Sequence, residues 1–136
     1  MISVVGVIAV VAVLCVATAV GVLRRSRGGR LREATDGGPL SLDFELGERA
    51  TLVQFSSAFC RPCVATRHVL GSVAGTVPGV RHVEVDAESN LELVRRLDVM
   101  STPTTLLLDG AGRVRRRATG VPRREAVLAA LADVME

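Results

Sequence analysis

The chain has 136 residues, a formal net charge of +3 and a hydrophobic fraction of 49%. Its only aromatic residues are Phe44, Phe55 and Phe59, so it lacks the stacked aromatic platforms on which many proteins bind single-stranded nucleic acid. Length and composition therefore leave room for one small domain with an aliphatic core, and they argue against a nucleic-acid partner.

The positive charge is concentrated in one short segment. Five of the 17 basic residues lie between Arg24 and Arg32 with no acid among them. The remaining 12 stand against 14 Asp plus Glu in residues 33–136, which gives that part a net charge of −2. The basic character of the chain therefore belongs to residues 24–32 and not to the domain that follows.

Residues 1–23 are predicted to form a transmembrane anchor. No charged residue occurs from Ile2 to Leu23, and a helix of these 22 residues would be about 33 Å long, enough to cross a hydrocarbon layer of about 30 Å. A cleaved signal peptide is the alternative, because Ala17–Ala19 resembles a small-residue cleavage site. The lack of a basic segment before the apolar run favours an uncleaved anchor that contacts the membrane through residues 2–23.

The orientation of the anchor follows from the arginine block. Five arginines follow the span and none precedes it, and the positive-inside rule places such a flank in the cytoplasm. We therefore expect a single-pass protein of the cell membrane whose domain faces the cytoplasm, with an extracytoplasmic domain as the alternative. Residues 24–39 are basic and rich in glycine, so we expect a flexible tether there and the folded domain in residues 40–136.

Beyond the tether, apolar patterns predict strands and helices in alternation. We expect strands over residues 50–56 and 79–87 and on either side of a turn at residues 109–112, and helices after Cys63, over residues 89–99 and from Pro122. The predicted order is β-α-β-α-β-β-α, which is an α/β domain.

Cys60 and Cys63 lie three positions apart, between the first strand and the first helix of the domain. At a helix N-terminus the free N–H groups and the helix dipole favour an anion, so we expect the pKa of the Cys60 thiol to fall below its free value of about 8.5. Arg61 adds a positive charge beside it. Cys63, one helical turn later, is placed to attack a mixed disulfide formed at Cys60. The pair is therefore predicted to exchange disulfides.

Two other interpretations of the cysteines remain open from spacing alone. Cys60 and Cys63 could bind Zn or Cu together with His68 or His82, although neither histidine stands at a recognisable ligand spacing from the pair. The domain could also be a docking module without catalysis, but such a module has no need of two adjacent reactive thiols. The redox interpretation is preferred, with no metal and no cofactor.

From about Leu40 to Glu136 the chain resembles the thioredoxin superfamily. The resemblance is carried by LVQF before the motif, CRPC itself, VEVD in the next strand, STPTTLLLDGAGRV and the late Gly120. It implies a thioredoxin-like fold with a mixed central sheet and a protein-disulfide reductase or other thiol-disulfide oxidoreductase. Its partners would be disulfide-containing proteins and an upstream thiol reductant or oxidant. The lead-in DFELGE is similar to the membrane-tethered, TlpA-like branch.

The resemblance also implies roles for individual residues. Cys60 and Cys63 would be catalytic, Pro103 would follow a cis peptide bond and lie against the sulfurs, and Thr102 would offer backbone hydrogen bonds to a substrate segment. The supporting residues of the site would be Phe59, Arg61, Pro62, Thr102 and Pro103.

Three positions depart from the family pattern. Phe59 stands where the family usually has Trp, and Arg-Pro replaces Gly-Pro at the centre of the motif. Gln54 occupies the place of a buried Asp that helps to move the proton of the second cysteine, and His82 falls near the family's buried Lys. Because a Gln cannot titrate, we expect substrate release by Cys63 to be slower or to use water as the base.

Overall fold

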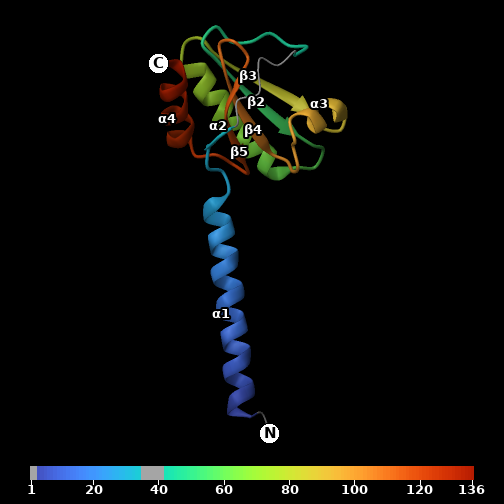
Figure 1. The fold of residues 1–136 in the computed structure, drawn as a ribbon, viewed down its shortest axis with the longest axis vertical. Helices are drawn as coiled ribbons and strands as arrows, with labels where there is room; N and C mark the ends of the chain where they lie inside the picture. The colour runs from blue at the N-terminus through green and yellow to red at the C-terminus, as the bar shows by residue number, and fades with distance from the viewer. Residues whose placement is uncertain (1–2, 35–41) are drawn as a thin grey trace.

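The computed structural model describes residues 3–34 and 42–136. Its first element is the 24-residue helix α1 (Val4–Arg27), which projects away from the folded domain (Figure 1). None of its residues is buried, and it is long and apolar enough to cross a membrane, a property that it shares with signal sequences. The predicted anchor is therefore a helix, and its charged end, Arg24–Arg27, continues that helix instead of starting the tether.

Among the described residues, the domain is built on one five-stranded sheet, which is mixed, as the resemblance implied, and has one strand more than the four predicted. Its strands lie in the order β1-β5-β4-β2-β3, and only β2 and β3 are parallel neighbours. The strands are β1 (Arg32–Glu33), β2 (Ala50–Ser56), β3 (Val80–Asp86), β4 (Thr104–Asp109) and β5 (Val114–Thr119). All seven residues of β2 are buried, which is typical of a strand covered on both faces, and this strand carries the chain into the cysteine motif.

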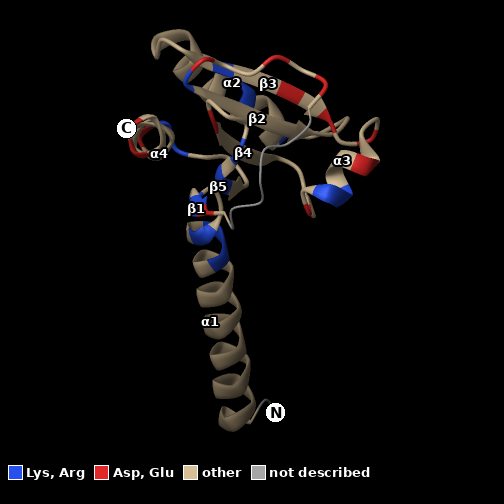
Figure 2. Cartoon of the chain, turned by 45° about the horizontal axis from the view of Figure 1, so that its top comes forward, with Lys and Arg blue, Asp and Glu red and all other residues tan. Residues whose placement is uncertain are grey.

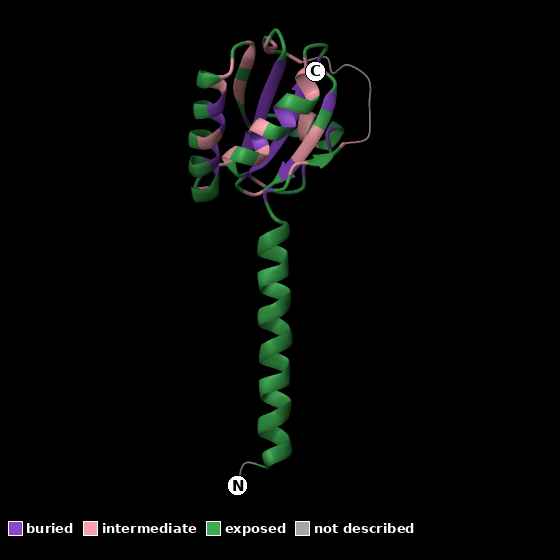
Figure 3. Ribbon diagram, turned by 90° about the vertical axis from the view of Figure 1, so that its left-hand side faces the viewer, coloured by how far each residue is buried: buried purple, intermediate pink, exposed green. Residues whose placement is uncertain are grey.

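Helices and loops cover the two faces of the sheet. The helices of the domain are α2 (Arg61–Thr76), α3 (Leu91–Arg96) and α4 (Arg124–Met135). On one face α2 and α4 pack with the sheet around Leu52, Leu70, Leu107, Val127 and Leu131. On the other face lies a second cluster that includes Val53, Phe55, Leu97, Leu106 and Leu108. Figure 3 shows that burial is concentrated in the sheet and on the inner sides of these helices, whereas α1 is exposed throughout.

The structure differs from the predicted element order in two places. Within the expected flexible tether, Arg32 and Glu33 pair with Arg117 and Arg116 of β5, so this part of the tether is an edge strand of the sheet. Residues 35–39 of the tether lie outside the described residues. The helix expected over residues 89–99 is confined to Leu91–Arg96 because Asp98, at φ 53°, turns the backbone out of the helix.

Candidate active site

The two cysteines lie at the junction between β2 and α2. Cys60 is the N-cap of α2 and Cys63 is in its first turn, and a disulfide joins their sulfur atoms across a Cα–Cα distance of 5.2 Å. The backbone N–H of Cys63 donates to Cys60 Sγ over 3.2 Å. Cys63 is only 1% exposed, whereas Cys60 is partly exposed. The pair is therefore asymmetric, with one sulfur open to attack and the other shielded.

The residues around the pair shape the start of the helix. Phe59 adopts a positive φ of 60° and is fully exposed, so its ring points away from the core. Arg61 and Pro62 begin α2, where a proline costs no hydrogen bond because the first N–H groups of a helix have no helical partner. The Pro62 carbonyl accepts the Thr66 hydroxyl over 2.9 Å. This first turn holds Cys60 at the helix N-terminus, as the sequence predicted.

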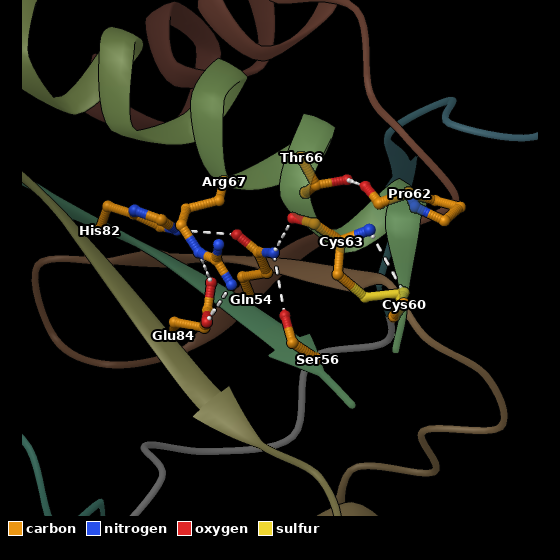
Figure 4. Close-up of polar contacts among 9 residues, drawn as sticks. All are labelled: Gln54, Ser56, Cys60, Pro62, Cys63, Thr66, Arg67, His82 and Glu84. Atoms are coloured by element: carbon orange, nitrogen blue, oxygen red, sulfur yellow. Dashed lines mark hydrogen bonds and ion pairs between the residues drawn. A yellow bond between two sulfur atoms is a disulfide. The ribbon is translucent and has the colours of Figure 1, made fainter. Parts of the chain in front are cut away.

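Gln54 lies beneath the pair and makes three polar contacts (Figure 4). It is fully buried, and its Nε2 donates to the Cys63 carbonyl over 2.8 Å and to Ser56 Oγ over 2.9 Å. Its Oε1 lies 3.0 Å from His82 Nε2. Because the Cys63 carbonyl and Ser56 Oγ both accept from the amide nitrogen, the amide oxygen Oε1 is the atom that faces His82. An amide oxygen can only accept, so His82 Nε2 is assigned the proton that it donates. The position at which the resemblance implies a buried carboxylate thus holds a neutral amide that is hydrogen-bonded to a histidine.

An ion pair flanks His82. Arg67 of α2 makes two hydrogen bonds to the Glu84 carboxylate of β3, at 2.6 and 2.8 Å, and these bonds lower the pKa of Glu84. Burial lowers the pKa of His82, the nearby Glu84 charge opposes this shift, and the Arg67 charge adds to it. Because the pKa of His82 is lowered from its usual 6.5, the imidazole is neutral at pH 7.

The loop before β4 lies next to the loop that leads to the cysteines. The Thr102–Pro103 peptide bond is cis, and Pro103 is buried. Thr102 Oγ1 lies 2.9 Å from Ser57 Oγ, in the segment between β2 and Cys60. The Pro103 carbonyl accepts the Gly120 N–H over 2.9 Å. These contacts join the three loops at one end of the sheet.

The metal interpretation needs His68 or His82 as a ligand beside Cys60 and Cys63. His82 contacts Gln54, and His68 is an exposed residue of α2. Within residues 3–34 and 42–136, no group of three or more His, Cys, Asp or Glu side chains is placed to hold a metal ion. The described part of the chain therefore gives no support to the alternative of a Zn or Cu site.

Three residues that form hydrogen bonds around Gln54 and His82 were not predicted from the sequence: Ser56, Arg67 and Glu84. Gln54 and Ser56 are two positions apart on β2 and so share a face of the sheet, which is a signal that the sequence contains. Arg67 and Glu84 are 17 residues apart on different elements, and only the packing of α2 on β3 brings them together. No local pattern could have paired them.

The fold and the cysteine pair together define a disulfide oxidoreductase of the thioredoxin fold. Comparison with known proteins specifies the family further, since residues 43–133 match the Thioredoxin family model. The chain belongs to the thioredoxin family.

Individual relatives agree with this assignment. The chain is 32% identical to the thioredoxin of Alicyclobacillus acidocaldarius over 91 residues. These residues make up 66% of this chain and 86% of that protein. It is also 32% identical over 88 residues, or 64% of this chain, to a bifunctional thioredoxin reductase/thioredoxin of Mycobacterium leprae, of which it spans only 19%.

Solved structures share the fold at low identity. A malaria parasite thioredoxin-2 superposes with a TM-score of 0.61 at 17% identity, covering 75% of this chain and 99% of that one. A mutant thioredoxin from Halobacterium salinarum gives a TM-score of 0.59 at 20% identity, covering 65% of this chain and 77% of that one. These likenesses concern the domain, and the resemblance to the TlpA-like branch stays a prediction.

Proposed function

We propose that this protein is a membrane-tethered protein-disulfide reductase in which Cys60 attacks the substrate and Cys63 resolves the intermediate. The observation that carries the proposal is the geometry of the pair, in which the Cys63 N–H donates to Cys60 Sγ while Cys63 itself is buried. An N–H aimed at the sulfur stabilises that sulfur as a thiolate. The attacking and resolving roles follow from this difference in exposure.

The exchange proceeds in two substitution steps that conserve electrons. The Cys60 thiolate attacks one sulfur of a substrate disulfide, and the other substrate sulfur leaves as a thiolate. Cys63, after losing its proton, attacks Cys60 Sγ, which forms the Cys60–Cys63 disulfide and releases the second substrate thiol. The structure holds this oxidised state. An upstream thiol reductant returns the two electrons in the reverse sequence.

The substrate would bind around the exposed cysteine. Phe59 and Arg61 are exposed on either side of Cys60, and Thr102 and Pro103 lie in the loop joined to this segment through Ser57. We assign these four residues to substrate binding, with the backbone of Thr102 hydrogen-bonding an extended substrate segment. Pro62 supports the site by fixing the first turn of α2.

Reduction of a short soluble peptide closed by one disulfide tests the catalytic assignment. The full-length protein in detergent, supplied with dithiothreitol, should reduce this peptide faster than dithiothreitol does, and Cys60→Ser should lower the rate to the background of dithiothreitol alone. Cys15→Ser is the matched control, because Cys15 is the free cysteine of α1 and lies outside the domain. If Cys60→Ser kept the activity of the unmodified protein, the proposed nucleophile would be wrong.

The membrane assignment rests on α1 and the arginines that follow it. Arg24, Arg25 and Arg27 occupy the last turn of the helix, and Figure 2 shows this basic end next to the domain. We propose a single-pass protein of the cell membrane with its domain on the cytoplasmic side, as the positive-inside rule favours. In intact spheroplasts the domain should resist added protease until the membrane is lysed. Digestion from outside would instead place the domain on the extracytoplasmic side.

A further inference from the structure

The membrane-spanning helix joins the domain without a long tether. Only residues 28–31 separate the end of α1 from β1. The Gly29 N–H donates to the Thr119 carbonyl at the end of β5, and Gly29 adopts φ 77° with the Val121 carbonyl so close that a Cβ would clash with it. Arg32 and Glu33 then pair with β5. The domain is therefore hydrogen-bonded to the segment that emerges from α1.

This junction lies at the end of the sheet that carries the cysteines. Thr119 is paired with Thr104, and Thr104 is paired with Phe55, so the three residues form a row across β5, β4 and β2. Neighbouring strands are about 4.8 Å apart, which places Gly29 about 15 Å from the end of β2 along this edge. Figure 1 shows β2 and the start of α2 directed to the side of the domain that faces α1. Cys60 follows β2 at this edge.

The length of the junction limits how far this edge stands from the bilayer. From Leu23 to Gly29 there are four helical steps of about 1.5 Å and two extended steps of about 3.3 Å, or about 13 Å in all. The polar layer of a bilayer occupies about 5 to 7 Å beyond the hydrocarbon on each side. The redox end of the sheet therefore stands within about 10 Å of the membrane surface when α1 spans the bilayer.

Exposed apolar side chains gather at the same edge. Phe59 follows β2, Met100 precedes β4 and Val121 follows β5, and the strand register brings these three loops to one end of the sheet. Their exposures are 105%, 86% and 39%. Outside α1, the described residues include just two other large exposed apolar side chains, Val64 and Leu91. The edge that carries Cys60 thus exposes three apolar side chains beside the charged Arg61, and this edge is turned toward the membrane.

We infer that the cysteine pair reduces disulfides in membrane-proximal segments of integral membrane proteins. The inference rests on the proposed function and specifies its substrate class. A folded domain of about 100 residues has a radius of gyration of about 13 Å, so it does not fit into a gap of about 10 Å between the redox end and the bilayer. A segment that leaves the membrane beside α1 reaches Cys60 directly. Two electrons pass from the Cys60–Cys63 dithiol to the disulfide of the segment. The segment then carries two thiols, and Cys60 and Cys63 are joined by a disulfide.

Two single-span probe proteins, reconstituted with the full-length chain in the same vesicles, test this inference. The near probe carries a disulfide-closed loop directly after its span, and the far probe carries the same loop after a helical spacer of about 30 residues, or about 45 Å. Rates are measured with limiting dithiothreitol, and the rate with Cys60→Ser is subtracted. The near probe should be reduced roughly tenfold faster than the far probe, because only the loop of the near probe lies at the height of Cys60 above the membrane, and tethered partners react quickly only where both can reach the same place.

A lengthened variant is the matched control. A helical insert of about ten residues between Arg27 and Gly28 raises the domain by about 15 Å and leaves the Gly29 contacts unchanged. It should lose the preference for the near probe while reducing dithiobis(nitrobenzoate), a small soluble disulfide, at the rate of the unmodified chain. Equal rates with both probes, or a preference that survives the insert, would overturn the inference while reduction of the small disulfide upheld the proposed function. Failure to reduce even that compound above the Cys60→Ser background would overturn both.

Discussion

Replacing Gln54 with Leu tests the stabilising role of the network beneath the cysteines. Leucine has a similar volume but removes all three contacts of the buried amide, to Ser56, the Cys63 carbonyl and His82. Gln54 and Ser56 are 0% and 6% exposed, so water cannot readily replace the lost partner of the serine hydroxyl. The variant should therefore fold to the same structure with lower stability.

Losing the contact with Gln54 costs a different free energy at each of its three partners. Leaving a buried polar group without a partner costs about 1 to 3 kcal/mol, and this applies in full to Ser56. The Cys63 carbonyl lies in the first turn of α2, where the helical pattern supplies another donor, and His82 is only partly buried. The apolar burial of leucine offsets part of the loss, which leaves a net destabilisation of about 2 kcal/mol. For a domain of about 100 residues this lowers Tm by about 10 °C.

Thermal and urea unfolding followed by circular dichroism would measure this change. Thr105→Val is a matched control, because Thr105 is paired with Gln54 across β2 and β4 and is fully buried. Its hydroxyl has no hydrogen-bond partner among the described residues, so its removal should leave stability unchanged or slightly higher. A Gln54→Leu protein within about 0.5 kcal/mol of the unmodified protein would refute the argument that the amide network stabilises the domain.

Three further predictions concern mechanism and pH. Cys63→Ser should accumulate mixed disulfides with substrates, visible as bands on non-reducing gels that dithiothreitol removes, because nothing resolves the adduct on Cys60; adducts on Cys60→Ser instead would reverse the two roles. Gln54→Asp should speed substrate release in single-turnover experiments by restoring a titratable base, and an unchanged rate would show that the base is not limiting. His82 takes up a proton near pH 6.5 in the unfolded chain, but only at lower pH in the folded chain, because burial lowers its pKa there. The free energy of unfolding should therefore fall as the pH drops below about 6.5. His82→Gln should reduce this dependence of the free energy of unfolding on pH, measured by denaturant titrations at several pH values, and an unchanged dependence would assign it to other groups. The stabilisation from Glu84 should be lost separately, below its ordinary pKa of 4.5, because Arg67 lowers the pKa of Glu84 in the folded chain.

The sequence predicted the main strands and helices because their burial patterns are local. A continuous apolar run marks β2, and helical spacing marks α2 and α4, whose inner residues form the core with the sheet. The cysteine motif was equally local, since Cys60 and the proline that follows it are typical of a helix start. These features need only the periodicity of each segment and not the arrangement of the others.

The edge strand β1 and its contacts could not be predicted in the same way. Two charged and exposed residues, Arg32 and Glu33, carry no hydrophobic period, and backbone hydrogen bonds to β5 place them in the sheet. Gly29 looked like part of a flexible glycine-rich segment. Its positive φ and its close contact with the Val121 carbonyl arise only once β5 and the segment that follows it have folded against it. Tertiary contacts thus converted part of an expected tether into a fixed junction.

The neutral group beneath Cys63 changes where the resolving proton can go. The sequence identified Gln54 as the substitution for a carboxylate, but its donor and acceptor directions follow from Ser56, the Cys63 carbonyl and His82. The amide accepts from His82 and donates to Cys63, so it offers the Cys63 thiol no basic atom. Water, or the substrate thiolate set free in the first step, must therefore take that proton, and because the second substrate sulfur leaves as a thiolate, a substrate whose leaving thiol has a lower pKa should be released faster. A buried carboxylate at this position would take the proton of Cys63 within the site, and this difference separates the two kinds of site.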